Sequence, residues 1–146
     1  MRTYFDTSIL VAASVDGNVH HDQARAALEL AKGAKMKGKN YVSGHGLAEA
    51  YSVLTRTPFR PTVYPSEALK ILDENILPYF QLITITPQMY VETIRECADR
   101  GWIGGLIHDA IHLRCAREAD CERIYTFNVH HFQQLAPDLA KRIGAP

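Results

Sequence analysis

Three acidic residues, Asp6, Glu49 and Asp109, stand in locally apolar stretches of the sequence. A carboxylate in such surroundings must be hydrogen-bonded, paired, protonated or metal-bound. Each one alone has a plain structural explanation: a helix cap for Asp6, and a half-exposed helix flank for the other two. If the three converge, their mutual repulsion calls for a divalent cation. Oxygen ligands select Mg²⁺ or Mn²⁺ over Zn²⁺.

Short β-prone segments alternate with amphipathic segments along the chain. The pattern predicts strands at 3–5, 41–43, 80–85 and 124–127. It predicts helices at 9–13, 20–32, 47–54, 65–76, 87–100 and 106–116. Residues 137–146 carry no pattern that assigns them.

The alternation predicts an α/β fold with a mostly parallel central sheet flanked by helices. Ligands of such sheets bind beyond the carboxyl ends of the strands. Asp6 follows the first predicted strand and Asn128 follows the last, so both are expected at this edge.

Length and composition restrict the function classes. The 146 residues, 47% hydrophobic and 22% charged, predict one globular domain spanning 1–146. The formal net charge is zero, so binding of a polyanion requires a local basic patch or a bound metal. An odd number of cysteines (three), without a secretory signal or a membrane-length apolar run, favours a reducing cytoplasm and no membrane.

Four motifs, in this order over nearly the whole chain, resemble the PIN domain family, in particular the VapC toxins of VapBC toxin–antitoxin pairs. They are Phe5-Asp6-Thr7-Ser8, Leu47-Ala48-Glu49 with Val53-Leu54-Thr55-Arg56, His108-Asp109-Ala110, and Thr126-Phe127-Asn128 through to His131-Phe132. The resemblance implies a small three-layer α/β fold. It also implies a Mg²⁺- or Mn²⁺-dependent endoribonuclease that leaves a 5′-phosphate and a 3′-hydroxyl.

The resemblance maps the family's acidic quartet onto Asp6, Glu49, Asp109 and the position of Asn128. We expect Asp6 and Asp109 to ligate metal directly because short side chains hold an ion rigidly. Glu49 would ligate, either directly or through water, or orient the attacking water. Asn128 and nearby hydroxyl groups would orient ligands and water. These hydroxyl groups belong to Thr7, Ser8 and Thr126.

The fourth position departs from the commonest pattern, because Asn128 is an amide and one formal negative charge is missing. Members of the family with Asn at this position exist, so the amide is compatible with activity. A second metal would be held less well than with four acids, or would bind only when substrate phosphate is present. The departure keeps two alternatives open. One is a degenerate PIN module that binds RNA or protein without cleaving, and the other is a PIN-fold nuclease of DNA or RNA processing.

Three partners follow from the resemblance: an RNA substrate, a cognate antitoxin protein and a second copy of the chain in a homodimer. For the RNA phosphates we favour Arg56, two helical turns beyond Glu49. Lysines at 32, 35, 37 and 39 also form a basic stretch, which we interpret as a solvated loop.

Most other patterns of potentially reactive residues are better explained by packing than by function. His108, His112 and Cys115 share a helical face and have zinc-ligand types, but the paired spacing of a zinc module is absent and packing is the commoner cause. Asp6-Thr7-Ser8 lacks the second Asp of an aspartyl-phosphate phosphatase. Trp102 could stack on a base, although core or interface packing is more frequent.

Overall fold

The computed structural model describes residues 1–33 and 39–146. Its centre is a five-stranded sheet in the order β3-β2-β1-β4-β5, in which every neighbouring pair of strands is parallel. The strands are β1 (Thr3–Phe5), β2 (Asn40–Ser43), β3 (Gln81–Ile83), β4 (Arg123–Tyr125) and β5 (Ile143–Gly144).

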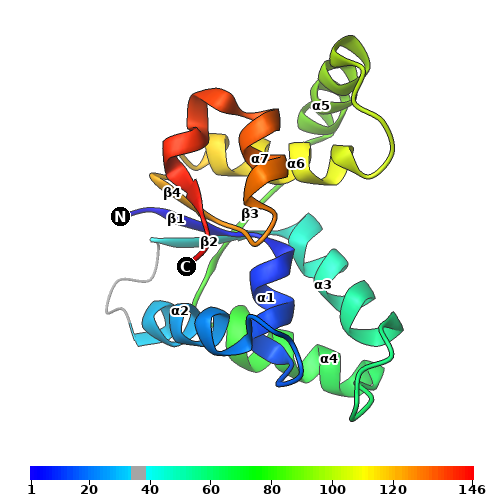
Figure 1. The fold of residues 1–146 in the computed structure, drawn as a ribbon, viewed down its shortest axis with the longest axis vertical. Helices are drawn as coiled ribbons and strands as arrows, with labels where there is room; N and C mark the ends of the chain where they lie inside the picture. Colours follow the sequence, from blue (N-terminus) through cyan, green and yellow to red (C-terminus); the bar gives the residue numbers. More distant parts are fainter. Residues whose placement is uncertain (34–38) are drawn as a thin grey trace.

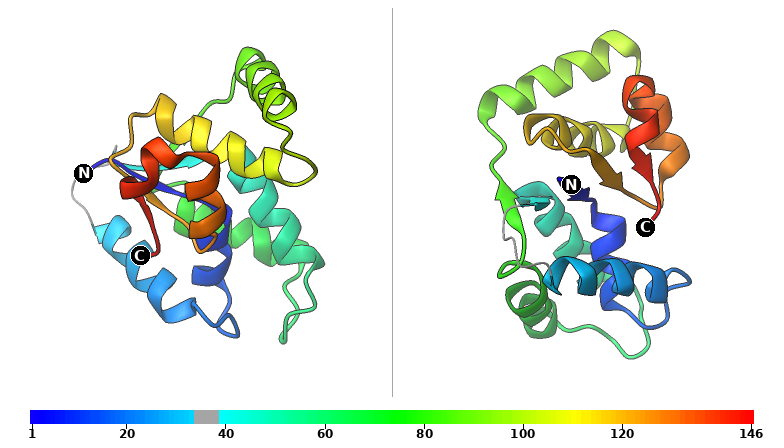
Figure 2. Two further views of the ribbon diagram at one scale, coloured as in Figure 1. Left: turned by 45° about the horizontal axis from the view of Figure 1, so that its top comes forward. Right: turned by 90° about the vertical axis from the view of Figure 1, so that its left-hand side faces the viewer.

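Helices cover both faces of this sheet, so the architecture has three layers (Figures 1 and 2). On one face lie α1 (Thr7–Ser14), α2 (His21–Gly33), α3 (Gly44–Arg56), α4 (Pro65–Ile71) and the π-helical turn η1 (Leu72–Ile76). On the other lie α5 (Pro87–Arg100), α6 (Leu106–Glu118), α7 (Val129–Leu135) and the 3₁₀ helix η2 (Pro137–Arg142).

The central strand shows why two separate cores form. Successive side chains of a strand point to opposite faces. Phe5 packs with the apolar faces of α1 and α2, whereas its neighbour Tyr4 packs among residues of α6 and α7. Both side chains are buried, as expected for a parallel sheet covered on both faces.

The strand order places a topological switch point beside β1. The chain runs from β1 to β2 on one side, and β4 is later added on the other side. Such a switch opens a crevice at the carboxyl ends of the two diverging strands. Asp6 follows β1 directly and Thr126 follows β4 directly, so both lie at this crevice.

The α/β class, the parallel sheet and the three layers are therefore confirmed. One prediction was wrong: Asn128 does not follow the last strand, because residues 137–146 form η2 and then β5, which pairs with β4. The strand β4 also ends at Tyr125, since the chain turns at Thr126 toward Asp6. Of the four lysines of the basic stretch, Lys35 and Lys37 lie outside the described residues. Among the described residues, no helix has the length and apolarity needed to span a bilayer.

We expect Leu54→Ala to destabilise the fold by about 2–5 kcal/mol, because Leu54 of α3 is 1% exposed in the core beneath the sheet. The matched control is Leu69→Ala on α4, whose side chain is 56% exposed. Urea unfolding monitored by circular dichroism measures both free energies. Equal losses for the two variants would contradict the core assignment.

Candidate active site

A cavity of about 350 Å³ opens at the carboxyl end of the sheet. The twelve lining residues in the described part of the chain include three carboxylates and neither lysine nor arginine. They are Asp6, Thr7, Ser8, Val11, Asn18, His20, Glu49, Val53, Asp109, His112, Phe127 and Asn128. A larger cavity of about 460 Å³ is lined by residues of α2 and the sheet edge, but it contains no acidic side chain. The chemistry-bearing residues therefore gather in the smaller cavity.

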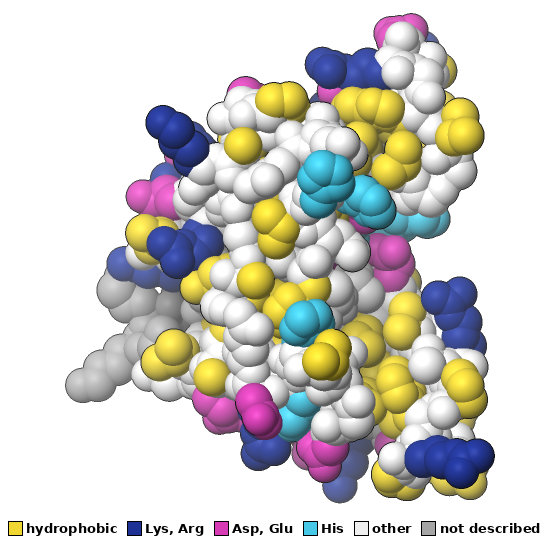
Figure 3. Space-filling view, in the orientation of Figure 1, with side chains coloured by type: hydrophobic (Ala, Val, Ile, Leu, Met, Phe, Trp, Pro, Cys, Tyr) yellow, Lys and Arg dark blue, Asp and Glu magenta, His cyan; other side chains and the backbone are white. Residues whose placement is uncertain are grey.

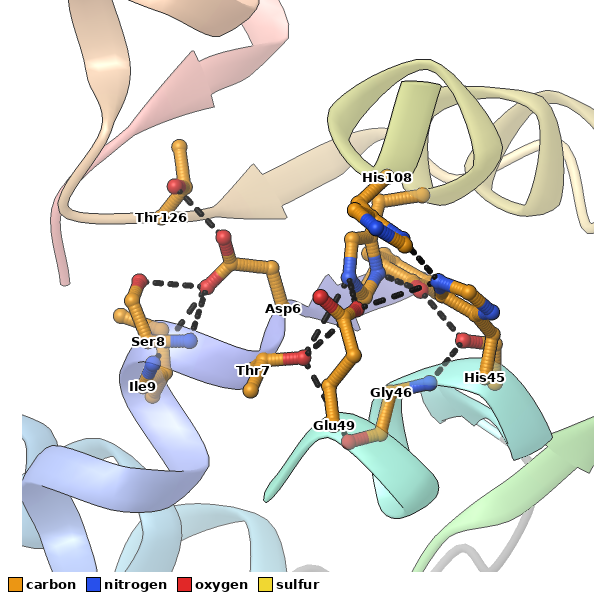
Figure 4. A network of polar contacts seen from close by, with 12 residues as sticks. Asp6, Thr7, Ser8, Ile9, His45, Gly46, Glu49, His108 and Thr126 are labelled. Carbon is orange, nitrogen blue, oxygen red and sulfur yellow. Dashed lines mark hydrogen bonds and ion pairs between the residues drawn. The ribbon is translucent and has the colours of Figure 1, made fainter. Parts of the chain in front are cut away.

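Asp6 is held by hydrogen bonds on both carboxylate oxygens (Figure 4). Its Oδ1 accepts from the backbone N–H of Ser8 and Ile9 and from the Ser8 hydroxyl, at 2.9, 3.3 and 2.5 Å. Its Oδ2 accepts from the Thr126 hydroxyl at 2.8 Å. Asp6 is thus the N-cap of α1, as one interpretation expected, and it also lines the cavity. Burial raises its pKa, and these hydrogen bonds together with the nearby His112 partly oppose that rise.

The Glu49 carboxylate is held in place by a series of hydrogen-bonded, buried polar side chains. His112 Nε2 lies 2.6 Å from Glu49 Oε1, and the Tyr4 hydroxyl lies 2.6 Å from His112 Nδ1. Because an ionised carboxylate only accepts hydrogen bonds, His112 donates to Glu49. Thr7 adds a longer contact of 3.3 Å to the same oxygen. Partial burial would raise the pKa of Glu49, but the hydrogen bond and charge of His112 and the other imidazoles prevail and lower it.

Gly46 lets the imidazole of His112 approach α3. A Cβ atom at residue 46 would lie 3.2 Å from His112 Cε1 and 3.2 Å from Ser43 Oγ. Both distances are tighter than ordinary van der Waals contact, so a side chain here would press on His112. The backbone N–H of Gly46 also donates to Ser43 Oγ, the N-cap of α3.

Asp109 reaches the cavity from the first turn of α6. Among the described residues its carboxylate has no hydrogen-bond or ion-pair partner within the usual distances. Burial and the charges of Asp6 and Glu49 raise its pKa, while His112 and His131 oppose the rise. Three carboxylates from three separate elements are therefore close enough to affect one another electrostatically.

The fourth expected position, Asn128, is exposed at the rim of the cavity. Its backbone N–H donates to Thr126 Oγ1 at 2.9 Å, and the backbone N–H of Phe127 donates to Ser8 Oγ at 3.0 Å. The hydroxyls of Ser8 and Thr126 thus tie the turn after β4 to Asp6. The residues that the sequence motifs singled out lie together in the structure, whereas their chemical roles stay predictions.

His45 was missed from the sequence, whereas His108 and His112 were singled out but assigned to packing. His45 Nε2 lies 3.4 Å from Glu49 Oε1 and 2.9 Å from His108 Nδ1. Burial lowers the pKa of His45 despite the nearby Glu49 charge. The signal was present, since His45 and Glu49 are four residues apart on one helix. Figure 3 shows histidines gathered on the α6–α7 side of this face, next to an acidic side chain.

The side chains of the predicted helical face, those of His108, His112 and Cys115, do not form one cluster. His112 and Cys115 are buried, and His112 is engaged with Glu49 and Tyr4, whereas His108 is exposed and meets His45. Trp102 lies outside the carboxylate cavity, packs with the α6–α7 core and is covered by the Arg100 guanidinium at 5.1 Å from the ring centroid.

Arg56, which was proposed for the RNA phosphates, and the described lysines of the basic stretch do not line the cavity. Arg56 is exposed at the end of α3. It continues the helix face of Glu49 and Val53, which do line the cavity. Lys32 is paired with Glu29 and Asn75 on the α2 side, and Lys39 lines the larger apolar cavity.

Comparisons with known proteins agree with this architecture. No curated protein matches the chain. Two solved structures are similar in fold. One is VapC20 of Mycobacterium tuberculosis, described as a sarcin–ricin loop cleaving toxin, with a TM-score of 0.67 and 16% identity, covering 86% of this chain and 89% of that one. The other is VapBC2 of Rickettsia felis bound to a promoter DNA fragment, with a TM-score of 0.62 and 23% identity, covering 92% and 93%.

A family model adds evidence at the level of sequence. The PIN domain model matches residues 3–136, which include the three carboxylates, Asn128 and the hydroxyl residues around them. The match spans nearly the whole sheet and both helical layers. The chain belongs to the PIN domain family.

Proposed function

We propose that this protein is a divalent-metal-dependent endoribonuclease that acts as the toxin of a type II toxin–antitoxin pair. The observation that carries the proposal is the convergence of Asp6, Glu49 and Asp109 on one cavity, to which no described lysine or arginine contributes. Three carboxylates crowd this cavity, and burial together with the charges of Asp6 and Glu49 raises the pKa of Asp109, which favours a bound cation. Membership of the PIN domain family and the two toxin-related folds support the choice of a nuclease.

The donor set fits Mg²⁺ or Mn²⁺ because the cavity offers carboxylate and amide oxygens. Asp6, Glu49 and Asp109 would hold the ion. When bound, such an ion would lower the pKa of a coordinated water so that hydroxide forms near neutral pH. Asn128 would add a neutral oxygen at the rim, with one charge less than a fourth acid.

The chain's own residues have separable tasks in this proposal. Ser8 and Thr126 would keep the Asp6 oxygens aimed at the cavity through the hydrogen bonds they donate. His112 would hold one oxygen of Glu49 and leave the other directed to the metal or to water. Asp109 has no such support among the described residues. Its side chain would therefore depend most on the bound ion for a fixed orientation.

The partners follow from the toxin assignment. VapBC2 of Rickettsia felis is a toxin–antitoxin assembly, so we propose that this chain also binds a cognate antitoxin. The proposal includes homodimerisation and an RNA substrate reached from the α3 side of the cavity. The cytoplasm is the compartment in which such a toxin would act.

Asp109→Asn should reduce Mg²⁺- or Mn²⁺-dependent RNA cleavage by about 100-fold or more, since it removes a charged ligand without changing shape. The control is Asp99→Asn on the exposed face of α5, which should cleave like the wild type. A fluorescent RNA assay, with EDTA and single-stranded DNA as further arms, measures the rates. RNA binding without any cleavage by the wild-type protein would instead support the degenerate module, and cleavage of DNA alone would support the processing nuclease.

The same substitution should stabilise the metal-free protein near neutral pH. Burial, Asp6 and Glu49 raise the pKa of Asp109 above its ordinary 3.8, so its ionised form costs free energy only in the folded state. That cost is absent below the ordinary pKa and grows as the pH rises through the raised pKa. Urea unfolding in EDTA should therefore show an advantage of Asp109→Asn at neutral pH that shrinks toward pH 4, about the ordinary value. An equal difference in unfolding free energy between the two proteins at pH 4 and at neutral pH would contradict the repulsion between Asp109 and the other carboxylates.

Arg56→Ala should weaken RNA binding about equally for all sequences and reduce the slope of log affinity against log salt by about 0.7 for a single strand. The control is Arg95→Ala, an exposed arginine on α5. Fluorescence anisotropy over a series of salt concentrations gives both slopes. An unchanged slope for Arg56→Ala would remove this residue from the RNA path.

A further inference from the structure

Two histidines and one glutamate place their ligand atoms together at the outer side of the Glu49 carboxylate (Figure 4). His45 and Glu49 come from α3 and His108 comes from the first turn of α6. One ligand atom from each residue can be chosen so that all three lie within 4.8 Å of one another. Neither Asp6 nor Asp109 belongs to this group.

The spacing of these atoms is close to what one tetrahedral ion requires. With zinc–ligand bonds of about 2.0–2.1 Å, neighbouring ligand atoms lie about 3.3 Å apart. His45 Nε2 is 2.9 Å from His108 Nδ1 and 3.4 Å from Glu49 Oε1. Shifts of a few tenths of an ångström would therefore bring these two pairs to the spacing of a metal site, and the ligand atoms of His108 and Glu49 lie within 4.8 Å of each other.

The sequence positions also suit chelation. His45 and Glu49 are four residues apart on one helix, the spacing by which two side chains on a helix face share an ion. His108 approaches from a second helix, with its ring stacked on that of His45 at a centroid distance of 5.0 Å. Because His108 is exposed, an ion and a completing water molecule have access from solvent.

Glu49 already has the outer support typical of a metal ligand. His112 Nε2 donates to Glu49 Oε1, and the Tyr4 hydroxyl engages the other ring nitrogen of His112. Such partners fix the orientation of a ligating group and conserve its geometry. His112 itself is excluded as a ligand, since both of its ring nitrogens are occupied.

We propose that His45, Glu49 and His108 form a second divalent-cation site, selective for zinc-class ions, that shares Glu49 with the nuclease centre. Imidazole nitrogens favour Zn²⁺ over Mg²⁺, whereas the carboxylates on the other side of Glu49 offer only oxygen ligands. The ion takes Glu49 Oε1, the oxygen that His112 also holds, and so reorients the carboxylate whose second oxygen the nuclease centre uses. Zn²⁺ therefore inhibits cleavage supported by Mg²⁺, and this consequence rests on the proposed function.

The test is a zinc titration of the purified full-length chain, stripped with a chelator and followed by calorimetry. Co²⁺ absorption spectra provide a second readout, since nitrogen ligands in tetrahedral geometry give visible bands. The wild type should bind one Zn²⁺ per chain. His45→Ala and His108→Ala should each lose about tenfold or more in affinity, and the double variant should lose the site. Circular dichroism verifies that the variants are folded.

The matched control is His130→Ala, an exposed histidine of α7 outside the group, which should bind Zn²⁺ like the wild type. Zinc binding that persists unchanged in the double variant, or that is absent from the wild type, overturns the proposal. Asp109→Asn should retain zinc while losing cleavage.

Cleavage assays separate this proposal from the proposed function. Micromolar Zn²⁺ should inhibit Mg²⁺-dependent cleavage by the wild type, and His108→Ala should resist that inhibition. Cleavage that needs Asp109 but is equally sensitive to Zn²⁺ in both proteins would overturn the shared site and leave the nuclease assignment intact. Zinc bound through the histidines of a chain that cleaves no RNA would support the site and contradict the nuclease.

Discussion

The structure depends on one electrostatic constraint, the gathering of three carboxylates at the end of a parallel sheet, in a cavity whose described lining residues include imidazoles but neither lysine nor arginine. A parallel sheet brings the carboxyl ends of its strands to one edge, and the switch beside β1 opens that edge into a crevice. Asp6 is set there by the backbone itself, as the cap of α1. The raised pKa values of Asp6 and Asp109 reflect the burial that results. In the proposed function, a divalent cation would offset this crowding.

Hydrogen bonding divides the three carboxylates into two classes. Asp6 and Glu49 are pre-oriented, the first by backbone N–H groups and hydroxyls and the second by His112. Asp109 carries no comparable support among the described residues. In the proposed nuclease, this pre-orientation would lower the entropic cost of binding a metal, and the less constrained Asp109 would let the site adapt when substrate enters. Glu49 also lies between the carboxylate cavity and the imidazoles of His45 and His108.

The sequence was sufficient for the fold class because period-two and helical patterns are local. It also placed Asp6, Glu49 and Asp109 in one site, since apolar neighbours marked them and the family motifs ordered them. It could not assign the last ten residues, where β5 exists only through pairing with β4. The link from His112 to Glu49 was equally inaccessible, because it depends on the approach of α6 to α3 across Gly46. Contacts between distant elements leave no periodic signal in a single sequence.

The most direct test of the account is a crystal of the protein soaked in Mn²⁺, with the ion located by its anomalous scattering. If the carboxylates share an ion, a peak is expected within bonding distance of the Asp6 and Asp109 carboxylates, in the cavity that they share with Glu49. A fully soaked crystal with an empty cavity, or with a peak at the imidazoles alone, would contradict it.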